Sequence, residues 1–122
     1  MRPWLRRSVV VLVLTLSSAG CAGAVAVQRV DELKGEWKGR RFGPVGNAPA
    51  AMTIGEGGAY KGVTFLDDGD RVFHGALVVV RPGQIRYQGS EGMGTVRISE
   101  EGGRRLLKFL RDEGGVDAVF RE

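Results

Sequence analysis

Residues 60–88 read YKGVTFL-DDGD-RVFHGALVVV-RPGQ-IRYQ, which is three β-prone runs separated by two turn signals. The first turn contains Asp68-Gly69, and an Asp-Gly pair between apolar runs is a strong signal for a tight β-hairpin. The second turn contains Pro82-Gly83, which combines the two residues most typical of turns. This stretch therefore predicts three consecutive antiparallel strands.

The same pattern continues toward both ends of the chain. Apolar residues alternate with smaller ones over residues 50–54, which is the period of two expected for a strand. The tripeptide E-G-G recurs at positions 56, 101 and 113, each time between β-prone runs, and its glycines can adopt positive φ without a Cβ clash. Residues 44–49 and 90–94 are expected to form loops. The predicted strands are Trp37–Phe42, Ala50–Ile54, Tyr60–Leu66, Arg71–Val80, Ile85–Gln88, Thr95–Ser99, Arg104–Arg111 and Val116–Arg121.

The order of these strands indicates the fold class. The chain has 122 residues, which is enough for one domain, and no segment is a convincing helix, which excludes parallel βαβ units. A small antiparallel sheet has two unpaired edges, and closure into a barrel removes them. We therefore expect an all-β fold, an antiparallel meander of eight short strands that closes into a small up-and-down barrel. A two-sheet sandwich is the alternative.

The first 20 residues have a different character. Three arginines within residues 1–7 precede an apolar run over residues 8–16, and small residues follow up to Cys21. This is the pattern of a secretory signal, and the run is far shorter than the roughly 18 residues of a membrane-spanning helix. The small residues ending at a cysteine resemble the lipobox of bacterial lipoproteins. The resemblance implies cleavage before Cys21 and lipidation of that residue with acyl chains such as palmitate.

The lipobox resemblance also implies a cellular location and a division of the chain into three segments. Residues 1–20 would be the lipoprotein signal peptide, 21–32 the lipidated N-terminus with a short spacer, and 33–122 a single barrel domain. Two or three acyl chains would make the attachment long-lived, whereas a single myristoyl chain binds only reversibly. Ala22 stands where aspartate would favour retention, so we expect anchoring in the cell envelope at the outer membrane, facing the periplasm.

Charge and cysteine content narrow the possible partners. The formal net charge of +4 comes mostly from the signal, because beyond residue 20 there are 15 basic and 14 acidic residues. A nearly neutral mature chain argues against nucleic-acid binding. Cys21 is the only cysteine, so an internal disulfide cannot form. The expected partner is the membrane, through the N-terminal lipid, and the oligomeric state stays open.

A second resemblance begins at Gly35-Glu36-Trp37, which opens the first predicted strand. G-x-W at the start of an eight-stranded meander resembles the opening of lipocalins and of avidin-type barrels. In those families the tryptophan packs across one barrel end, often against an arginine from a late strand. The resemblance gives Trp37 this place and leaves Arg111 and Arg121 as the candidate arginines. The chain is shorter than a lipocalin and lacks its C-terminal helix, which argues against a wide ligand cavity.

Groupings that would support catalysis or metal binding are missing from the sequence beyond the signal. There is one histidine, His74, and two serines, Ser90 and Ser99, neither of which lies in a G-x-S-x-G elbow. One histidine does not make a zinc site, and the carboxylates of residues 67–70 lack the spacing of a calcium loop. We expect a protein that is not an enzyme and that has no cofactor and no metal.

Aromatic side chains with a polar tip are the best candidates for a binding site. These are Trp37, Tyr60 and Tyr87, and we add Arg41, which lies in a basic doublet that can face anionic groups. The expected function is a non-catalytic binding module for a small amphiphilic ligand or an envelope component.

An alternative function is a structural lipoprotein that docks a protein partner or self-associates through its outer wall. It rests on the apolar runs at residues 77–80 and 106–110, which break the alternation and place apolar side chains on both faces. The plainer interpretation is that the N-terminal turn or a loop covers the outward side chains.

Overall fold

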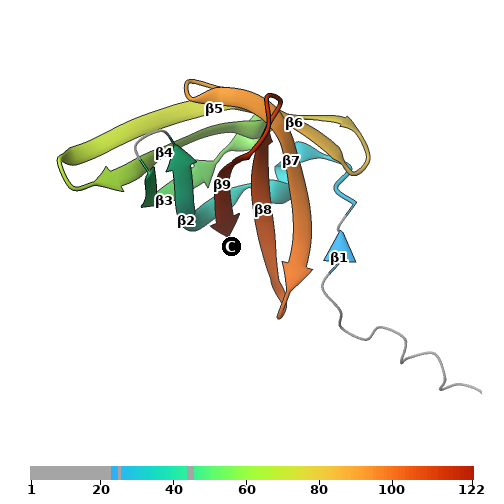
Figure 1. Cartoon of the computed structure of the whole chain (residues 1–122). Coiled ribbons are helices and arrows are strands. Elements are labelled where there is room, and N and C mark those ends of the chain that lie inside the picture. Colours follow the sequence, from blue (N-terminus) through green and yellow to red (C-terminus); the bar gives the residue numbers. More distant parts are fainter. Residues whose placement is uncertain (1–22, 25, 44–45) are drawn as a thin grey trace, which may run out of the picture.

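A computed structural model describes residues 23–24, 26–43 and 46–122 of the chain (Figure 1). Cys21 and residues 1–20, the predicted signal peptide, lie outside these residues. A two-residue strand, β1 (Gly23–Ala24), and two short 3-10 turns, η3 (Val30–Leu33) and η4 (Glu56–Gly58), accompany the main strands. All eight predicted strands are present: β2 (Gly35–Gly43), β3 (Gly46–Ile54), β4 (Ala59–Leu66), β5 (Gly69–Arg81), β6 (Gln84–Gly89), β7 (Gly92–Glu101), β8 (Arg104–Arg111) and β9 (Val116–Arg121).

The strands β2 to β9 form a closed antiparallel barrel in meander order. Each strand pairs with the next one along the chain, and the first and last complete the ring. In that closing ladder Lys38 pairs with Arg121 and Arg41 pairs with Ala118. The barrel prediction is therefore confirmed, and the sandwich alternative does not apply.

The Asp-Gly turn is as tight as the sequence predicts. Leu66 pairs with Gly69, so only Asp67 and Asp68 lie between the two strands. Gly69 has φ of 131°, a value that side chains with a Cβ rarely adopt. This hairpin, β4–β5, projects from the barrel in Figure 1.

The prediction of a loop over residues 44–49 is wrong from residue 46 onward. β3 begins at Gly46, and Pro49 pairs with Arg40 inside the strand. A proline is tolerated in a strand where its missing N–H is not needed by a neighbour. β3 pairs with β4 only from Ala50 onward, so Pro49 has β2 on one side and no strand partner on the other.

The barrel interior is filled by side chains. Buried residues alternate with more exposed ones along the strands, and in β5 the inward positions Phe73 and Leu77 are buried while Gly75 between them is half-buried. Aromatic rings occupy much of the space, with neighbouring ring centroids 4.7–6.3 Å apart. An eight-stranded barrel is just wide enough for its own side chains to fill. The rings belong to Tyr60, Phe73, Tyr87, Phe109 and Phe120.

The two ends of the barrel differ. We call the end that holds η3, η4 and the turns at 82–83 and 102–103 the closed end, because the segment before β2 packs into it. Val27 and Leu33 are fully buried there, and the Gly83 amide donates to the Val27 carbonyl at 3.0 Å. The opposite end, with the turns at 67–68, 90–91 and 112–115, we call the open end. The residues taken as spacer from the sequence thus contribute to the core from Val27 onward.

Trp37 lies at the closed end, and an arginine packs on it. Its indole N–H donates to the Leu33 carbonyl at 3.0 Å, and the Arg105 guanidinium carbon lies 5.3 Å from the ring centroid. The choice of Arg111 or Arg121 for this contact is wrong. Arg105 is near the start of β8, at the same barrel end as Trp37, whereas Arg111 ends β8 at the open end. Arg121 is exposed, because its neighbour Phe120 takes the inward position.

Candidate functional site

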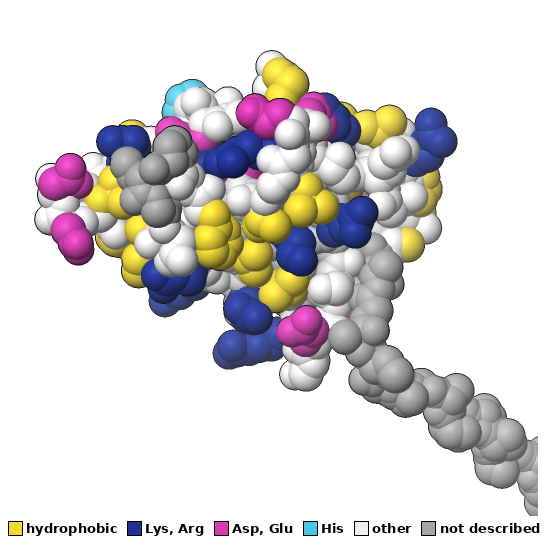
Figure 2. All heavy atoms as spheres, viewed as in Figure 1, with side chains coloured by type: hydrophobic (Ala, Val, Ile, Leu, Met, Phe, Trp, Pro, Cys, Tyr) yellow, Lys and Arg dark blue, Asp and Glu magenta, His cyan; other side chains and the backbone are white. Residues whose placement is uncertain are grey.

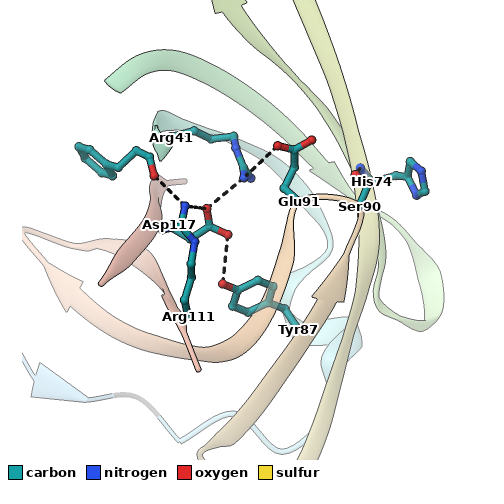
Figure 3. A network of polar contacts seen from close by, with 8 residues as sticks. Arg41, His74, Tyr87, Ser90, Glu91, Arg111 and Asp117 are labelled. Carbon is teal, nitrogen blue, oxygen red and sulfur yellow. Dashed lines mark hydrogen bonds and ion pairs between the residues drawn. The ribbon is translucent and has the colours of Figure 1, made fainter. Parts of the chain in front are cut away.

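A cluster of polar side chains lies inside the open end, centred on Asp117 (Figure 3). Arg41 and Arg111 each donate from Nη2 to Asp117 Oδ1 at 3.0 Å. The Tyr87 hydroxyl donates to Asp117 Oδ2 at 3.1 Å. These four residues come from β2, β6, β8 and β9, so the cluster ties together strands from both sides of the barrel.

A β-bulge places the Asp117 side chain in the interior. Phe109 pairs with Ala118 and Leu110 with Val116, so Asp117 is an extra residue in β9 without a partner in β8. A bulge lets two successive side chains turn toward the same face. Ala118 is fully buried and Asp117 is only 1% exposed, although they are neighbours in the chain.

The two arginines outnumber the single carboxylate between them. The Arg41 side chain is 11% exposed and the Arg111 side chain 25%, so water screens both charges only partly. Arg111 also donates to the Phe42 carbonyl at 3.0 Å, and the Arg41 guanidinium carbon lies 4.7 Å from the Phe73 ring centroid. A buried charge is tolerated when it is paired and hydrogen-bonded. Here the Asp117 carboxylate is the hydrogen-bonded partner of both arginines.

Both interior tyrosines stay protonated at neutral pH. Burial raises the pKa of Tyr60 to about 12, an effect that the nearby Arg41 charge partly opposes. Burial also raises the pKa of Tyr87, and the negative charge of Asp117 acts in the same direction. Each phenol is therefore a hydrogen-bond donor.

The Tyr60 hydroxyl, unlike that of Tyr87, does not donate to Asp117. It lies against Gly75 and Gly89, where a Cβ atom would come within 2.4 and 2.3 Å of the oxygen. Only glycine leaves room for it at those two positions. Tyr60 is 6% exposed, and within residues 23–24, 26–43 and 46–122 its hydroxyl makes no hydrogen bond. This buried donor is unsatisfied by the described part of the protein.

Glu91 stands at the edge of the cluster, in the turn between β6 and β7. Its Oε1 lies 3.8 Å from Arg41 Nη2, and its side chain is 35% exposed. A hollow of about 670 Å³ opens beside it at the barrel rim. Phe42 and Met93 give this hollow apolar walls, and Glu91, Arg111, Asp112 and Glu113 give it charged ones. We call it the rim hollow.

The structure brings some of the candidate site residues together and separates others. Arg41 and Tyr87 both bind Asp117, and both Tyr60 and Arg41 lie beside the Phe73 ring, with the Tyr60 ring centroid 6.3 Å and the Arg41 guanidinium carbon 4.7 Å from its centroid. Trp37 is at the closed end and takes no part in the cluster. Cys21, the candidate lipidation site, lies outside the described residues.

Sequence reasoning missed Asp117, Arg111 as a member of this cluster, and Glu91. One signal for Asp117 was present in the sequence. It is the single acid within the apolar strand V-D-A-V-F, residues 116–120. A lone acid in such a run is either turned outward or buried with partners, and only the bulge decides between the two.

The residues considered for catalysis do not join the cluster. His74 is exposed on the outer face of β5, and Figure 3 shows its ring pointing away from Asp117. Ser90 bonds the backbone of His74 rather than its imidazole, with its Oγ accepting from the His74 amide at 3.1 Å. In the described ranges no three His, Cys, Asp or Glu side chains gather as metal ligands would.

The outer wall has two apolar features. Val78 and Val80 are 57% and 53% exposed, so the interpretation that a turn or loop covers the run at residues 77–80 is wrong for its outward half. Ala51, Val63 and Val72 form a cross-strand row on β3, β4 and β5, over a hollow of about 520 Å³. Apolar side chains are mixed with charged ones of both signs on the face shown in Figure 2.

Comparisons with known proteins identify no relative. The chain matches no family model, no curated protein and no solved structure. Among the described residues, no helix has the length and apolar character needed to cross a membrane.

Proposed function

We propose that this protein is a lipid-anchored, non-catalytic binding module of the bacterial cell envelope, and that it takes a small amphiphilic ligand at the rim hollow. The anchoring part rests on the sequence, on the charged and apolar start that ends at Cys21. The acyl chains would hold the barrel at the membrane surface, most simply at the periplasmic side of the outer membrane.

One observation supports the rim as the binding place. Aromatic rings fill the interior, whereas the open end has a hollow of about 670 Å³ beside partly buried charges. Ligand sites are concave, mostly apolar and furnished with a few polar groups that fix orientation. Phe42 and Met93 supply apolar contact, and Arg111 with Glu91 supplies the polar part.

Native mass spectrometry of residues 22–122, purified gently from the host without the anchor, tests this function. This chain contains every strand that the structure describes. We expect a reproducible added mass on the monomer. Met93→Lys should remove it, because a charge would enter the apolar wall of the rim hollow.

Val80→Lys is the matched control. Val80 is 53% exposed and Met93 48%, but Val80 lies on the outer wall near the closed end. A bare wild-type protein, or an added mass that Met93→Lys leaves in place, would contradict binding at the rim.

A second candidate function is docking through the outer wall, as a structural or interaction lipoprotein. The cross-strand row of Ala51, Val63 and Val72 favours it, because Val72 is 70% exposed beside a hollow. Sedimentation of residues 22–122 discriminates the two. A dimer that Val72→Glu converts to monomer supports docking, and a wild-type monomer argues against self-association.

A further inference from the structure

We infer that the ligand of the rim hollow has an acidic headgroup, a carboxylate or a phosphate, and that this group displaces Glu91 from Arg41. The inference rests on the proposed function and names the chemistry of the same site. Three observations support it: unsatisfied donors, two arginines that share one oxygen of Asp117, and a loosely held carboxylate already in place.

The first observation is a set of hydrogen-bond donors without acceptors. Of the Arg41 nitrogens, only Nη2 bonds to an acceptor within the described ranges, and it serves Asp117. The guanidinium has five N–H groups, so most of its donor capacity is unused there. The Tyr60 hydroxyl is a second donor without a described acceptor, in the gap left by Gly75 and Gly89. Buried donors without an acceptor favour a ligand that supplies oxygen atoms.

The second observation is the charge of the cluster. Arg41 and Arg111 share one oxygen of Asp117, and among the described residues the only other carboxylate within 4 Å of either guanidinium is that of Glu91, 3.8 Å from Arg41. The Tyr87 hydroxyl already occupies the other oxygen of Asp117. An additional anion would be held by charge-assisted hydrogen bonds, which are stronger than neutral ones.

The third observation is that Glu91 occupies the place of such an anion only loosely. Its carboxylate is 3.8 Å from Arg41 Nη2, beyond hydrogen-bond length, whereas Asp117 is at 3.0 Å. More than a third of the Glu91 side chain faces solvent, so the turn can swing it outward at little cost. An acid that reaches deeper than Glu91 would meet Arg41 directly and would lie near Tyr60.

The apolar remainder of the ligand would follow the rim hollow outward. Met93 is 48% exposed, and Met93 and Phe42 line the hollow together with Glu91 and Arg111. The apolar chain of the ligand would contact these side chains, and its headgroup would bind Arg41. The ligand would therefore be bound in one orientation, with its acidic group pointing into the barrel.

Titration of ¹⁵N-labelled residues 22–122 with four probes tests the inference. The probes, kept below their micelle concentrations, are dodecanoate, dodecyl phosphate, neutral dodecyl maltoside and inorganic phosphate. We expect both acidic amphiphiles to shift the amides of Gly92 and Met93 and to bind about tenfold tighter than the maltoside.

Each other result has a distinct meaning. If the maltoside shifts the same amides with equal affinity, the acidic headgroup is overturned and binding at the rim stands. If inorganic phosphate binds as tightly as dodecyl phosphate, the acid site stands and the amphiphile is overturned. If no probe shifts these amides, both proposals are overturned.

A matched pair of variants separates displacement of Glu91 from a general charge effect. Glu91→Gln and Glu113→Gln each remove one negative charge from the rim hollow, but only Glu91 faces Arg41. We expect Glu91→Gln to raise dodecanoate affinity about threefold and Glu113→Gln to change it much less. Equal effects of the two variants would overturn the displacement.

Tyr60→Phe tests the inner donor. Its ring keeps the packing, and its hydroxyl has no described partner to lose. We expect dodecanoate affinity to fall about fivefold while maltoside affinity and folding stay unchanged. An unchanged dodecanoate affinity would overturn the contact between Tyr60 and the acid.

Discussion

Tyr60 and Tyr87 are two buried phenols with opposite surroundings. The Tyr87 hydroxyl donates to a carboxylate that is itself buried, whereas the Tyr60 hydroxyl lies in a gap between glycines. Both rings pack on the same neighbour, Phe109, whose ring centroid lies 4.7 Å from that of Tyr87 and 5.9 Å from that of Tyr60. The two residues therefore differ mainly in what their oxygen atoms do.

Removing each oxygen should separate a structural hydrogen bond from an available donor. We expect Tyr87→Phe to lower the free energy of unfolding by about 1.5–3 kcal/mol, because a buried hydrogen bond to a charged group is lost. Tyr60→Phe should leave this free energy unchanged or slightly higher. Urea denaturation followed by circular dichroism measures both, and an equal loss in the two variants would contradict the assignment.

At the opposite end of the barrel, Arg105 depends on a carboxylate for its place on Trp37. Its guanidinium is hydrogen-bonded to Glu122 and also donates to the Glu32 carbonyl at 2.6 Å. The hydrogen bonds from Arg105 hold the pKa of Glu122 below its ordinary value of 4.5. A carboxylate with a lowered pKa in the folded state stabilises that state above its ordinary pKa, and the contribution is lost as the pH falls through the lower value.

The fluorescence of Trp37 should report this loss. Trp37 is the only tryptophan beyond residue 20, so residues 22–122 give a single emitter. We expect constant emission from pH 7 to pH 5 and a change below pH 4.5, as Glu122 takes up a proton and releases Arg105. Glu122→Gln should show the altered emission already at pH 7. A pH profile identical to that of the wild type would show that Glu122 does not hold Arg105.

At the scale of the strands, turn chemistry and alternation made most of the fold predictable. The Asp-Gly and Gly-Gly turns set where strands end, and period-two runs such as residues 50–54 set which face is buried. The bulge at Asp117 was not predictable, because it depends on the register between β8 and β9 rather than on either sequence. Prediction of the site was limited for the same reason, because the position of Asp117 depends on that bulge. Tyr87 and Arg41 could be named as candidates, but their common partner could not.

Close approach of strands explains why some interior positions are glycine. A Cβ on Gly39 would lie 1.8 Å from the Val119 carbonyl oxygen, across the β2–β9 ladder that closes the barrel. Gly94 has the same relation to the Leu110 carbonyl on β8, at 1.9 Å. The closure of the barrel therefore depends on residues without a side chain.

Alanine substitution in β2 tests this requirement with a control in the same strand. Gly39→Ala should destabilise the protein by about 1–3 kcal/mol, because the ladder must move apart to admit a methyl group. A Cβ on Gly43 meets nothing within 4 Å, so Gly43→Ala should be neutral or slightly stabilising. Thermal unfolding of both variants tests this requirement. Equal melting temperatures would contradict the need for glycine at position 39.

At the scale of the whole molecule, the predicted lipid anchor would be attached near the closed end, opposite the candidate site. β1 pairs with the end of β7, Gly23 with Glu100, and Figure 1 shows it beside the end of that strand. Cys21 precedes β1 by two residues, which span at most about 7 Å. Acyl chains on Cys21 would therefore hold the closed end against the membrane. A ten-residue strand such as β7, tilted in a barrel, puts the open end about 25 Å away.

This polarity predicts that the rim hollow faces the aqueous compartment and not the leaflet that holds the anchor. The acylated protein in vesicles with a headgroup quencher tests it, using a fluorophore on Glu101→Cys at the end of β7 or on Asp68→Cys in the β4–β5 turn. We expect strong quenching at position 101 and little at position 68, because only the closed end approaches the headgroups. Residues 22–122 without lipid should show neither. Stronger quenching at position 68 would mean that the rim contacts the bilayer, and the ligand would then be a lipid taken from that surface.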